Sequence, residues 1–194
     1  MDIHYKKFLV VILLISVSCI LFHTPDYFPL EEGYKWIYSC SDIQGGYTKT
    51  DEVVGERQLS NGDIVKVVVE TVIRGNDVEV DTQYIYKDER KVLLYTDINN
   101  LSYQTLLELP LKEGDSWIVT EIPNISKSEV LVLHQGEEVI VPYKTVKNCY
   151  KLQLTYTYLG VSVIYYVWFG PDIGVVKVQA VNGSMIEELT EFEE

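Results

Sequence analysis

The sequence predicts an all-β protein, an antiparallel meander of about ten to twelve strands that curls into a half-barrel or folds over itself as a sandwich. Three observations predict this fold class. Apolar and polar residues alternate with a period of two over most of the chain, as they do in half-buried strands. Turn dipeptides of Asn and Gly separate these runs. A nine-residue frame occurs twice, which indicates two related halves.

The chain opens with a predicted signal peptide, residues 1–18. Lys6 and Lys7 precede a charge-free, largely apolar run over residues 8–22. Fifteen helical residues cover about 22 Å, less than the roughly 30 Å of a bilayer core. Cys19 follows small residues, as in a bacterial lipobox, and would then carry lipid. Lipidation at Cys19, plain secretion and an uncleaved anchor stay open, and all three place the body of the protein outside the cytoplasm.

Residues 19–26 are then a tether, and residues 27–194 are a β-rich domain with a repeat that starts near 28 and 109. The repeated frame is Pro-Leu-x-Glu-Gly-x-x-Trp-Ile, and its two copies lie 81 positions apart. We expect each glycine to turn the chain and each tryptophan to begin a strand with its indole in the core. A binding role for the indoles is the alternative. The positions concerned are Pro29, Gly33, Trp36, Pro110, Gly114 and Trp117.

The strands follow in order. Residues 65–73, 78–86 and 150–158 alternate apolar with polar side chains, so each predicts a strand with one face in the core. Residues 161–169 are almost continuously apolar, which predicts a strand covered on both faces. Residues 99–108 are the only candidate for a helix, which the following proline would stop. The acidic run over residues 187–194 is typical of a solvated tail.

The charge of the chain argues against a nucleic-acid partner, and the cysteines leave open whether the domain contains a disulfide. The net charge is −13, and loss of residues 1–18 makes it −14, so phosphate backbones repel the chain and nucleic-acid binding is not expected. Cys40 and Cys149 have two interpretations. A disulfide between them would close a loop of about 110 residues and add roughly 4–5 kcal/mol. Alternatively, both are buried free thiols that pack as small apolar groups.

Residues typical of catalysis are scarce. Of the three histidines, only His134 lies well inside the folded body, so no metal site built from several imidazoles is expected. The sequence has no nucleophile elbow and no phosphate-binding glycine loop, and we expect no cofactor and no enzymatic activity. The many strand tyrosines either fill the core or line a concave face for a hydrophobic ligand. The lining residues would be Tyr156, Tyr158, Tyr165 and Trp168.

Four segments share their order and spacing with a known pattern. Residues 27–38 carry Tyr-Phe-Pro-Leu-x-x-Gly-x-x-Trp-x-Tyr, and residues 110–117 carry the shorter Pro-Leu-x-x-Gly-x-x-Trp. Together with residues 141–152 and 168–177, they resemble a family of uncharacterised bacterial exported proteins and lipoproteins. The resemblance implies an antiparallel β fold in the cell envelope, and it assigns no activity and no functional residue.

The expected function is therefore that of a non-enzymatic cell-envelope protein, held at a membrane through its N-terminal anchor, with a structural or protein-interaction role. The alternative is a carrier or sensor of a hydrophobic ligand on the concave aromatic face of the sheet. A hydrolase that uses dispersed carboxylates is a third and weaker hypothesis. The partner protein or ligand is not identified by the sequence.

Overall fold

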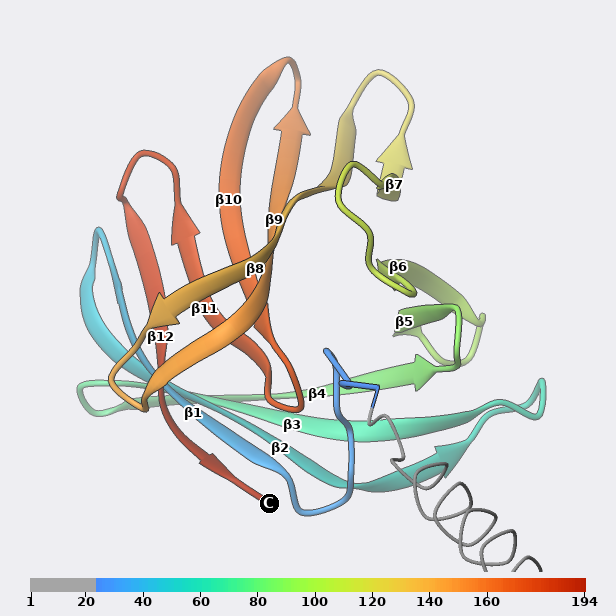
Figure 1. Cartoon of the computed structure of the whole chain (residues 1–194). Helices are drawn as coiled ribbons and strands as arrows, with labels where there is room; N and C mark the ends of the chain where they lie inside the picture. The colour runs from blue at the N-terminus through green and yellow to red at the C-terminus, as the bar shows by residue number, and fades with distance from the viewer. Residues whose placement is uncertain (1–23) are drawn as a thin grey trace, which may run out of the picture.

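The computed structural model describes residues 24–194, which form one nearly closed, barrel-shaped sheet of twelve antiparallel strands with no helix in that range (Figure 1). The predicted signal peptide and Cys19 lie outside the described residues. The all-β meander predicted from the sequence is confirmed. The strands are β1 (Lys35–Asp42), β2 (Gly45–Gln58), β3 (Ile64–Arg74), β4 (Asp77–Lys87), β5 (Lys91–Asp97), β6 (Ser102–Glu108), β7 (Ser116–Ile122), β8 (Ser126–Ile140), β9 (Thr145–Tyr158), β10 (Val161–Gly170), β11 (Gly174–Ala180) and β12 (Met185–Glu193).

The order of strands in the sheet is β6-β5-β4-β3-β2-β1-β12-β11-β10-β9-β8-β7. Each strand except β1, β12, β6 and β7 therefore pairs with its two neighbours in sequence, through hairpins. The first and last strands pair with each other in the middle of the sheet, from Lys35 opposite Glu193 to Asp42 opposite Met185. The two free edges, β6 and β7, are consecutive in sequence and lie near each other at the seam of the barrel, where no ladder of backbone hydrogen bonds joins them.

Each copy of the repeated frame forms the same turn. Gly33 and Gly114 have φ angles of 93° and 90°, which glycine adopts without strain. The N–H of Gly33 donates to the carbonyl of Val53 at 2.8 Å, and the N–H of Gly114 donates to the carbonyl of Val132 at 2.9 Å. The buried indoles of Trp36 and Trp117 follow in β1 and β7.

The core lies on the concave face, where side chains from all parts of the sheet converge. A smaller core on the opposite face packs Leu59 and Val65 against Tyr95. The residues of the main core include Trp36, Tyr38, Val53, Val68, Ile85, Leu107, Trp117, Val132, Leu152, Phe169 and Leu189.

Two sequence expectations are wrong, and the one candidate for a helix is a strand. Residues 99–108 do not form a helix, because residues 102–108 pair with β5 as edge strand β6. The acidic run over residues 187–194 is not a solvated tail. It belongs to β12, where Leu189 is fully buried and Phe192 stacks on Trp36 with ring centroids 5.5 Å apart. Its apolar residues Leu189 and Phe192 are three positions apart, and a β-bulge opposite Ile37 and Tyr38 brings both to the same face of the sheet.

The apolar stretch at residues 161–169 is covered only at one end. Val161 is 70% exposed, whereas Trp168 and Phe169 are buried. The first half of β10 belongs to a hairpin that extends beyond the packed part of the barrel, so its continuous apolar character does not reflect burial on both faces.

Candidate functional site

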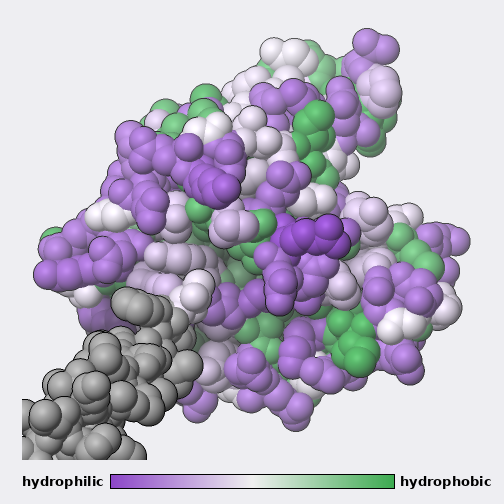
Figure 2. All heavy atoms as spheres, turned by 45° about the vertical axis from the view of Figure 1, so that its right-hand side comes forward, coloured by the Kyte–Doolittle hydropathy of each residue, from purple (hydrophilic) through white to green (hydrophobic). Residues whose placement is uncertain are grey.

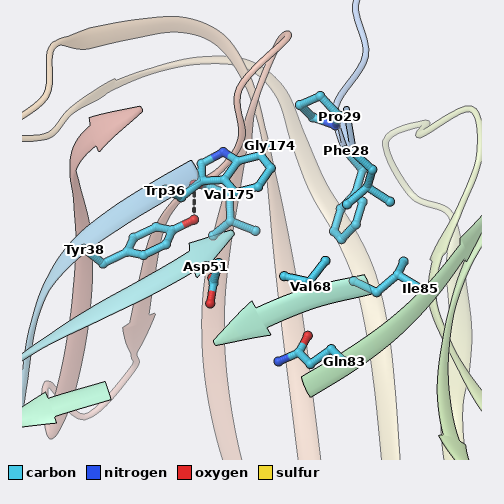
Figure 3. A pocket seen from close by; sticks show the side chains of 11 residues that line it. Phe28, Pro29, Trp36, Tyr38, Asp51, Val68, Gln83, Ile85, Gly174 and Val175 are labelled. Atoms are coloured by element: carbon cyan, nitrogen blue, oxygen red, sulfur yellow. Dashed lines mark hydrogen bonds between the residues drawn. The ribbon is translucent and has the colours of Figure 1, made fainter. Parts of the chain in front are cut away.

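The concave face holds a small cavity beside the first copy of the repeated frame, next to Pro29 and Trp36. Its volume is about 80 Å³. It is walled by apolar side chains, with Asp51 and Gln83 as polar members, and Figure 3 shows Phe28 lying above Val68 and beside Ile85. This volume holds a few waters and is well below the roughly 300–1,000 Å³ of small-molecule sites. The residues that enter the barrel ahead of β1 thus occupy space that a ligand would need.

A group of charged side chains lies beside this cavity. Lys49 Nζ is 2.7 Å from Glu187 Oε2 and 3.8 Å from Asp51 Oδ2. Burial raises the pKa of Asp51 to about 6, because the nearby Lys49 only partly offsets the loss of hydration. Asp51 Oδ1 is buried and accepts no hydrogen bond from the described residues. Asp51 therefore faces the cavity as the least well satisfied of the ionisable groups in this cluster.

The same cluster lacks an activated nucleophile. Burial, with a smaller effect of Glu187, raises the pKa of the Cys40 thiol to about 12, so the thiol is protonated at neutral pH. Tyr38 donates its hydroxyl to the carbonyl of Val175 at 3.0 Å, and Tyr47 donates to Glu187 Oε1 at 3.2 Å (Figure 3 shows the first of these). The arrangement is a hydrogen-bonded network that links β1, β2 and β12, and it offers no general base paired with a nucleophile.

The segment before β1 is clamped across the end of the barrel. Two hydrogen bonds join Asp26 and Asp172: the N–H of Asp26 donates to the side-chain Oδ1 of Asp172 at 2.9 Å, and the N–H of Asp172 donates to the carbonyl of Asp26 at 2.7 Å. Lys87 of β4 forms an ion pair with Asp26 and donates to the carbonyl of Phe28 at 2.8 Å. The clamp thereby connects β4 to the β10–β11 turn and fixes Phe28 inside the barrel.

The four residues predicted to line a ligand site do not share one face. Tyr156 and Tyr158 lie on the concave side of β9, and Tyr165, opposite Leu154, lies on the same side of β10. Trp168 is three positions beyond Tyr165, so the alternation of the strand turns it to the other face, where it donates to Glu137 Oε2 at 2.7 Å. Trp168 also lies beneath Lys151, whose Nζ is 4.9 Å from the ring centroid.

Exposed apolar side chains gather where the β7–β8 and β9–β10 hairpins end. These hairpins are neighbours, because β8 pairs with β9 from Ser126 opposite Tyr158 onwards, and the N–H of Leu159 donates to the carbonyl of Ile125 at 2.8 Å. Residues 152–171 contain no charged side chain. Figure 2 shows hydrophobic surface among polar groups at the upper end of the molecule. We call this group the tip patch; it comprises Ile122, Ile125, Tyr156, Tyr158, Leu159, Val161 and Val163.

The two frame tryptophans differ in their hydrogen bonding. Trp36 Nε1 donates to the carbonyl of Ile173 at 2.5 Å. Trp117 Nε1 is buried and finds no acceptor among the described residues. Buried polar groups are nearly always hydrogen-bonded. Trp117 therefore lacks a hydrogen-bond acceptor that its environment would ordinarily supply, whereas Trp36 has one.

Cys40 and Cys149 are both buried free thiols, as in the second interpretation of the sequence, and the disulfide of the first interpretation is absent. Cys40 lies on β1 and Cys149 on β9, with β12, β11 and β10 between them. Four strand spacings amount to roughly 19 Å along the sheet, whereas bridged Cα atoms lie about 4.4–6.8 Å apart.

Two features are missing from residues 24–194. No group of three or more His, Cys, Asp or Glu side chains in that range is arranged to hold a metal ion. Within the same residues, no helix has the length and apolar character needed to cross a membrane.

Sequence reasoning missed Lys49, Asp51 and Glu187 as members of one cluster. Lys49 and Asp51 alternate on one face of β2, but nothing local indicates that a glutamate 138 positions later lies beside them. The pairing of the first and last strands brings these residues together, and only a prediction of that pairing would have found the cluster.

Comparison with solved structures identifies proteins of the same fold. A putative lipoprotein from Parabacteroides distasonis ATCC 8503 superposes with a TM-score of 0.57 at 12% sequence identity, covering 88% of this chain and 100% of the other. A putative exported protein with YmcC-like fold from Bacteroides fragilis NCTC 9343 gives a TM-score of 0.58, also at 12% identity and with the same coverage. No protein-family model and no curated protein matches the sequence. At this identity the likeness establishes the fold alone.

Proposed function

We propose that the protein is a non-enzymatic, extracytoplasmic interaction module that is attached to a membrane through lipid on Cys19 and presents the tip patch to a protein partner. Two proteins of this fold are described as a putative lipoprotein and a putative exported protein, which supports the location. The predicted signal peptide and the lipobox-like cysteine support the anchor. The position of the tip patch relative to the N-terminal segment carries the proposal.

The tip patch and the N-terminal segment lie at opposite ends of β10. That strand runs ten residues, about 33 Å, from Val161 beside the tip to Gly170, and the turn that follows holds Asp26 through Asp172. A lipid on Cys19 would be seven residues from Asp26, a reach of at most about 25 Å. The membrane therefore lies near the clamped end, and the tip patch projects away from it.

The filled interior around Phe28 supports interaction over transport. Phe28 packs near Phe169, with ring centroids 6.3 Å apart, and the cavity beside it measures about 80 Å³, whereas wider hollows of about 410 and 350 Å³ lie beside Trp117 and beside Lys87. One observation favours a carrier as the second candidate. Tyr156 and Tyr158 lie on the concave side of an uncharged hairpin and are 41% and 50% exposed, so a hydrophobic ligand could cover them.

The anchor is tested by metabolic labelling of the full chain with radioactive palmitate in a bacterial host. We expect label in the membrane fraction for the natural sequence and its loss for Cys19→Ser, with Cys40→Ser as the control that keeps the label. Label retained by Cys19→Ser, or absent from the natural chain, would contradict a lipid anchor at this position.

The partner surface is tested by a photo-crosslinking amino acid placed at position 158 of the full chain in living cells. We expect a discrete crosslinked protein, and we expect Leu159→Asp to remove it without loss of folding because Leu159 is 65% exposed. A crosslinker at Val78, which is 60% exposed on the distant β3–β4 hairpin, is the matched control and should give no such product.

Two outcomes would count against this interaction. Equal crosslinking from positions 158 and 78 would show that the tip patch has no specific partner. A small molecule bound to the native chain and released on denaturation, seen as discrete extra mass, would favour the carrier instead.

A further inference from the structure

The two copies of the repeated frame begin strands with matching positions and unequal neighbours. Lys35 and Ile37 of β1 correspond to Ser116 and Ile118 of β7, 81 positions later. On one side, β1 pairs with β2 as β7 pairs with β8. On the other side, β1 pairs with β12, with Lys35 opposite Glu193 and Ile37 opposite Glu191. On that side β7 is the edge of the sheet.

Trp117 of β7 lacks both the aromatic contact and the indole hydrogen bond that Trp36 of β1 makes. Trp36 stacks on Phe192 of β12 and donates its indole N–H to Ile173. Among the described residues, Trp117 has no aromatic partner and its buried indole N–H has no acceptor. The two copies of the frame therefore differ within one molecule: the tryptophan of the first copy has an aromatic partner and a hydrogen-bond acceptor, and among the described residues the tryptophan of the second copy has neither.

The free edge of β7 presents backbone groups for pairing. The N–H of Val132 donates to the carbonyl of Asp115 at 2.9 Å, and Trp117 opposes Val130 two residues on. In an antiparallel ladder, alternate residues point their N–H and C=O groups to the same neighbour. The backbone groups of Ser116 and Ile118 therefore point away from β8 and into the open seam.

We propose that β7 is a strand acceptor, and that an extended, basic segment of a partner protein pairs with its free edge and closes the seam. The inference rests on the proposed interaction function and names the backbone site that would bind the partner. An added strand takes the place that β12 has beside β1, and its apolar residues pack near Trp117 as Phe192 packs on Trp36. Backbone hydrogen bonds supply affinity in this mode, and alternate side chains supply selectivity.

Charge around the edge selects a basic partner. Glu113 and Asp115 precede β7 and Glu121 lies near its end, with Lys112 as the one basic residue within residues 112–122. Lys127 lies opposite Glu121 in the ladder and forms an ion pair with Glu129, so one lysine faces two carboxylates there. A strand that carries Lys or Arg at its ends would meet these carboxylates and gain favourable cross-strand pairs.

The same charges disfavour a second copy as the occupant. If β7 paired antiparallel with another β7 about Ile118, Glu121 of each copy would lie opposite Asp115 of the other. Like charges directly opposite destabilise a strand pair, and this arrangement would contain two such pairs.

The test uses the full chain, purified in mild detergent, and a capped nine-residue peptide of alternating Thr and Val with a central Phe and Lys at both ends. We expect saturable binding by fluorescence anisotropy and a shift of one indole N–H signal in the nitrogen–proton spectrum, assigned to Trp117 by its loss in Trp117→Phe. A peptide with Glu in place of Lys should bind at least tenfold more weakly, and one with central Pro should not bind.

The acceptor strand is tested by Ile118→Pro, which removes a seam-facing N–H at an edge where proline is tolerated. We expect at least a tenfold loss of peptide affinity, whereas Ile118→Thr keeps the N–H and should stay within about threefold of the natural chain. Ile118→Lys, an edge-blocking charge, gives the same tenfold loss should the proline variant fold poorly.

Equal binding to the natural chain and to Ile118→Pro would overturn the proposal, as would equal binding of the basic and acidic peptides. Self-association in sedimentation that Ile118→Pro abolishes would instead identify a second copy as the occupant. Leu159→Asp should leave peptide binding unchanged. If the peptide does not bind at β7 but the crosslink from position 158 is intact, only the strand-acceptor proposal is rejected. If the crosslink from position 158 is absent, the proposed function is rejected.

Discussion

Asp51 shows at the scale of one residue how the barrel interior accommodates charge. One lysine, Lys49, serves several carboxylates, and its shortest contact is to Glu187. Burial would lower the pKa of Lys49, but Asp51 and Glu187 more than offset this effect and raise it. The cluster thus holds more negative than positive charge, and the acid with a buried, unpaired oxygen is the one whose charged form is disfavoured.

We expect Asp51→Asn to stabilise the protein at pH 7.5. The folded-state pKa of about 6 exceeds the ordinary value of 3.8, so the folded protein binds the proton more tightly and its free energy of unfolding falls as the pH rises from about 4 to about 6. Asparagine carries no charge, so the variant does not lose this stability, and its free energy of unfolding at pH 7.5 should be higher by on the order of 1–3 kcal/mol. The measurement is urea unfolding of both proteins from pH 4 to pH 7.5.

The control for this prediction is Asp42→Asn. Hydrogen bonds from Arg74 lower the pKa of Asp42, so its ionised form contributes stability that is present above the unfolded-state pKa and is lost as the pH falls. The two variants should therefore change stability in opposite directions at neutral pH. A destabilised Asp51→Asn at pH 7.5 would show that the ion pair with Lys49 outweighs the cost of burial.

At the scale of elements, the two frame turns provide a matched pair. Gly33 and Gly114 both have φ near +90°, and a Cβ at either position would meet no atom within 4 Å. Any cost of alanine there is therefore backbone strain rather than a clash.

We expect Gly33→Ala and Gly114→Ala to lower the free energy of unfolding by similar amounts, about 1–3 kcal/mol each. Gly46→Ala is the control, because Gly46 is not in the left-handed region and its Cβ would lie 3.7 Å from the carbonyl oxygen of Cys40, an ordinary contact. Chemical unfolding of the three variants measures the difference. A clearly unequal cost at the two frame positions would mean that the two turns are not equivalent.

Elements were predictable where the alternation of side chains was visible. Residues 78–86 and 150–158 fall within β4 and β9 because polar and apolar side chains alternate there. β12 was missed because a β-bulge breaks its alternation and most of its polar residues are acidic, which is also the pattern of a solvated tail. Trp168 was assigned to the wrong face because composition shows that a residue is apolar but only the register shows where it points.

At the scale of the whole molecule, the meander and its curvature were predictable and the closure was not. Local turns determine which hairpins form, so the sequence indicates ten of the neighbour relations in the sheet. The pairing of β1 with β12 depends on contacts between residues about 150 positions apart, and no local signal carries it. The clamp at Asp26 and the cluster at Lys49 both follow from that pairing, which explains why neither was anticipated.

That pairing also sets a condition on the timing of folding. β1 is synthesised first, but it cannot pair with β12 until the end of the chain has been synthesised, because these two strands form the middle of the sheet. Contacts between distant residues cost loop-closure entropy before they stabilise anything, and until then β1 and its aromatic residues stay exposed to other chains. A chain truncated just before Met185 would therefore keep nine of its ten hairpin-linked strand pairs and still lack the centre of its fold.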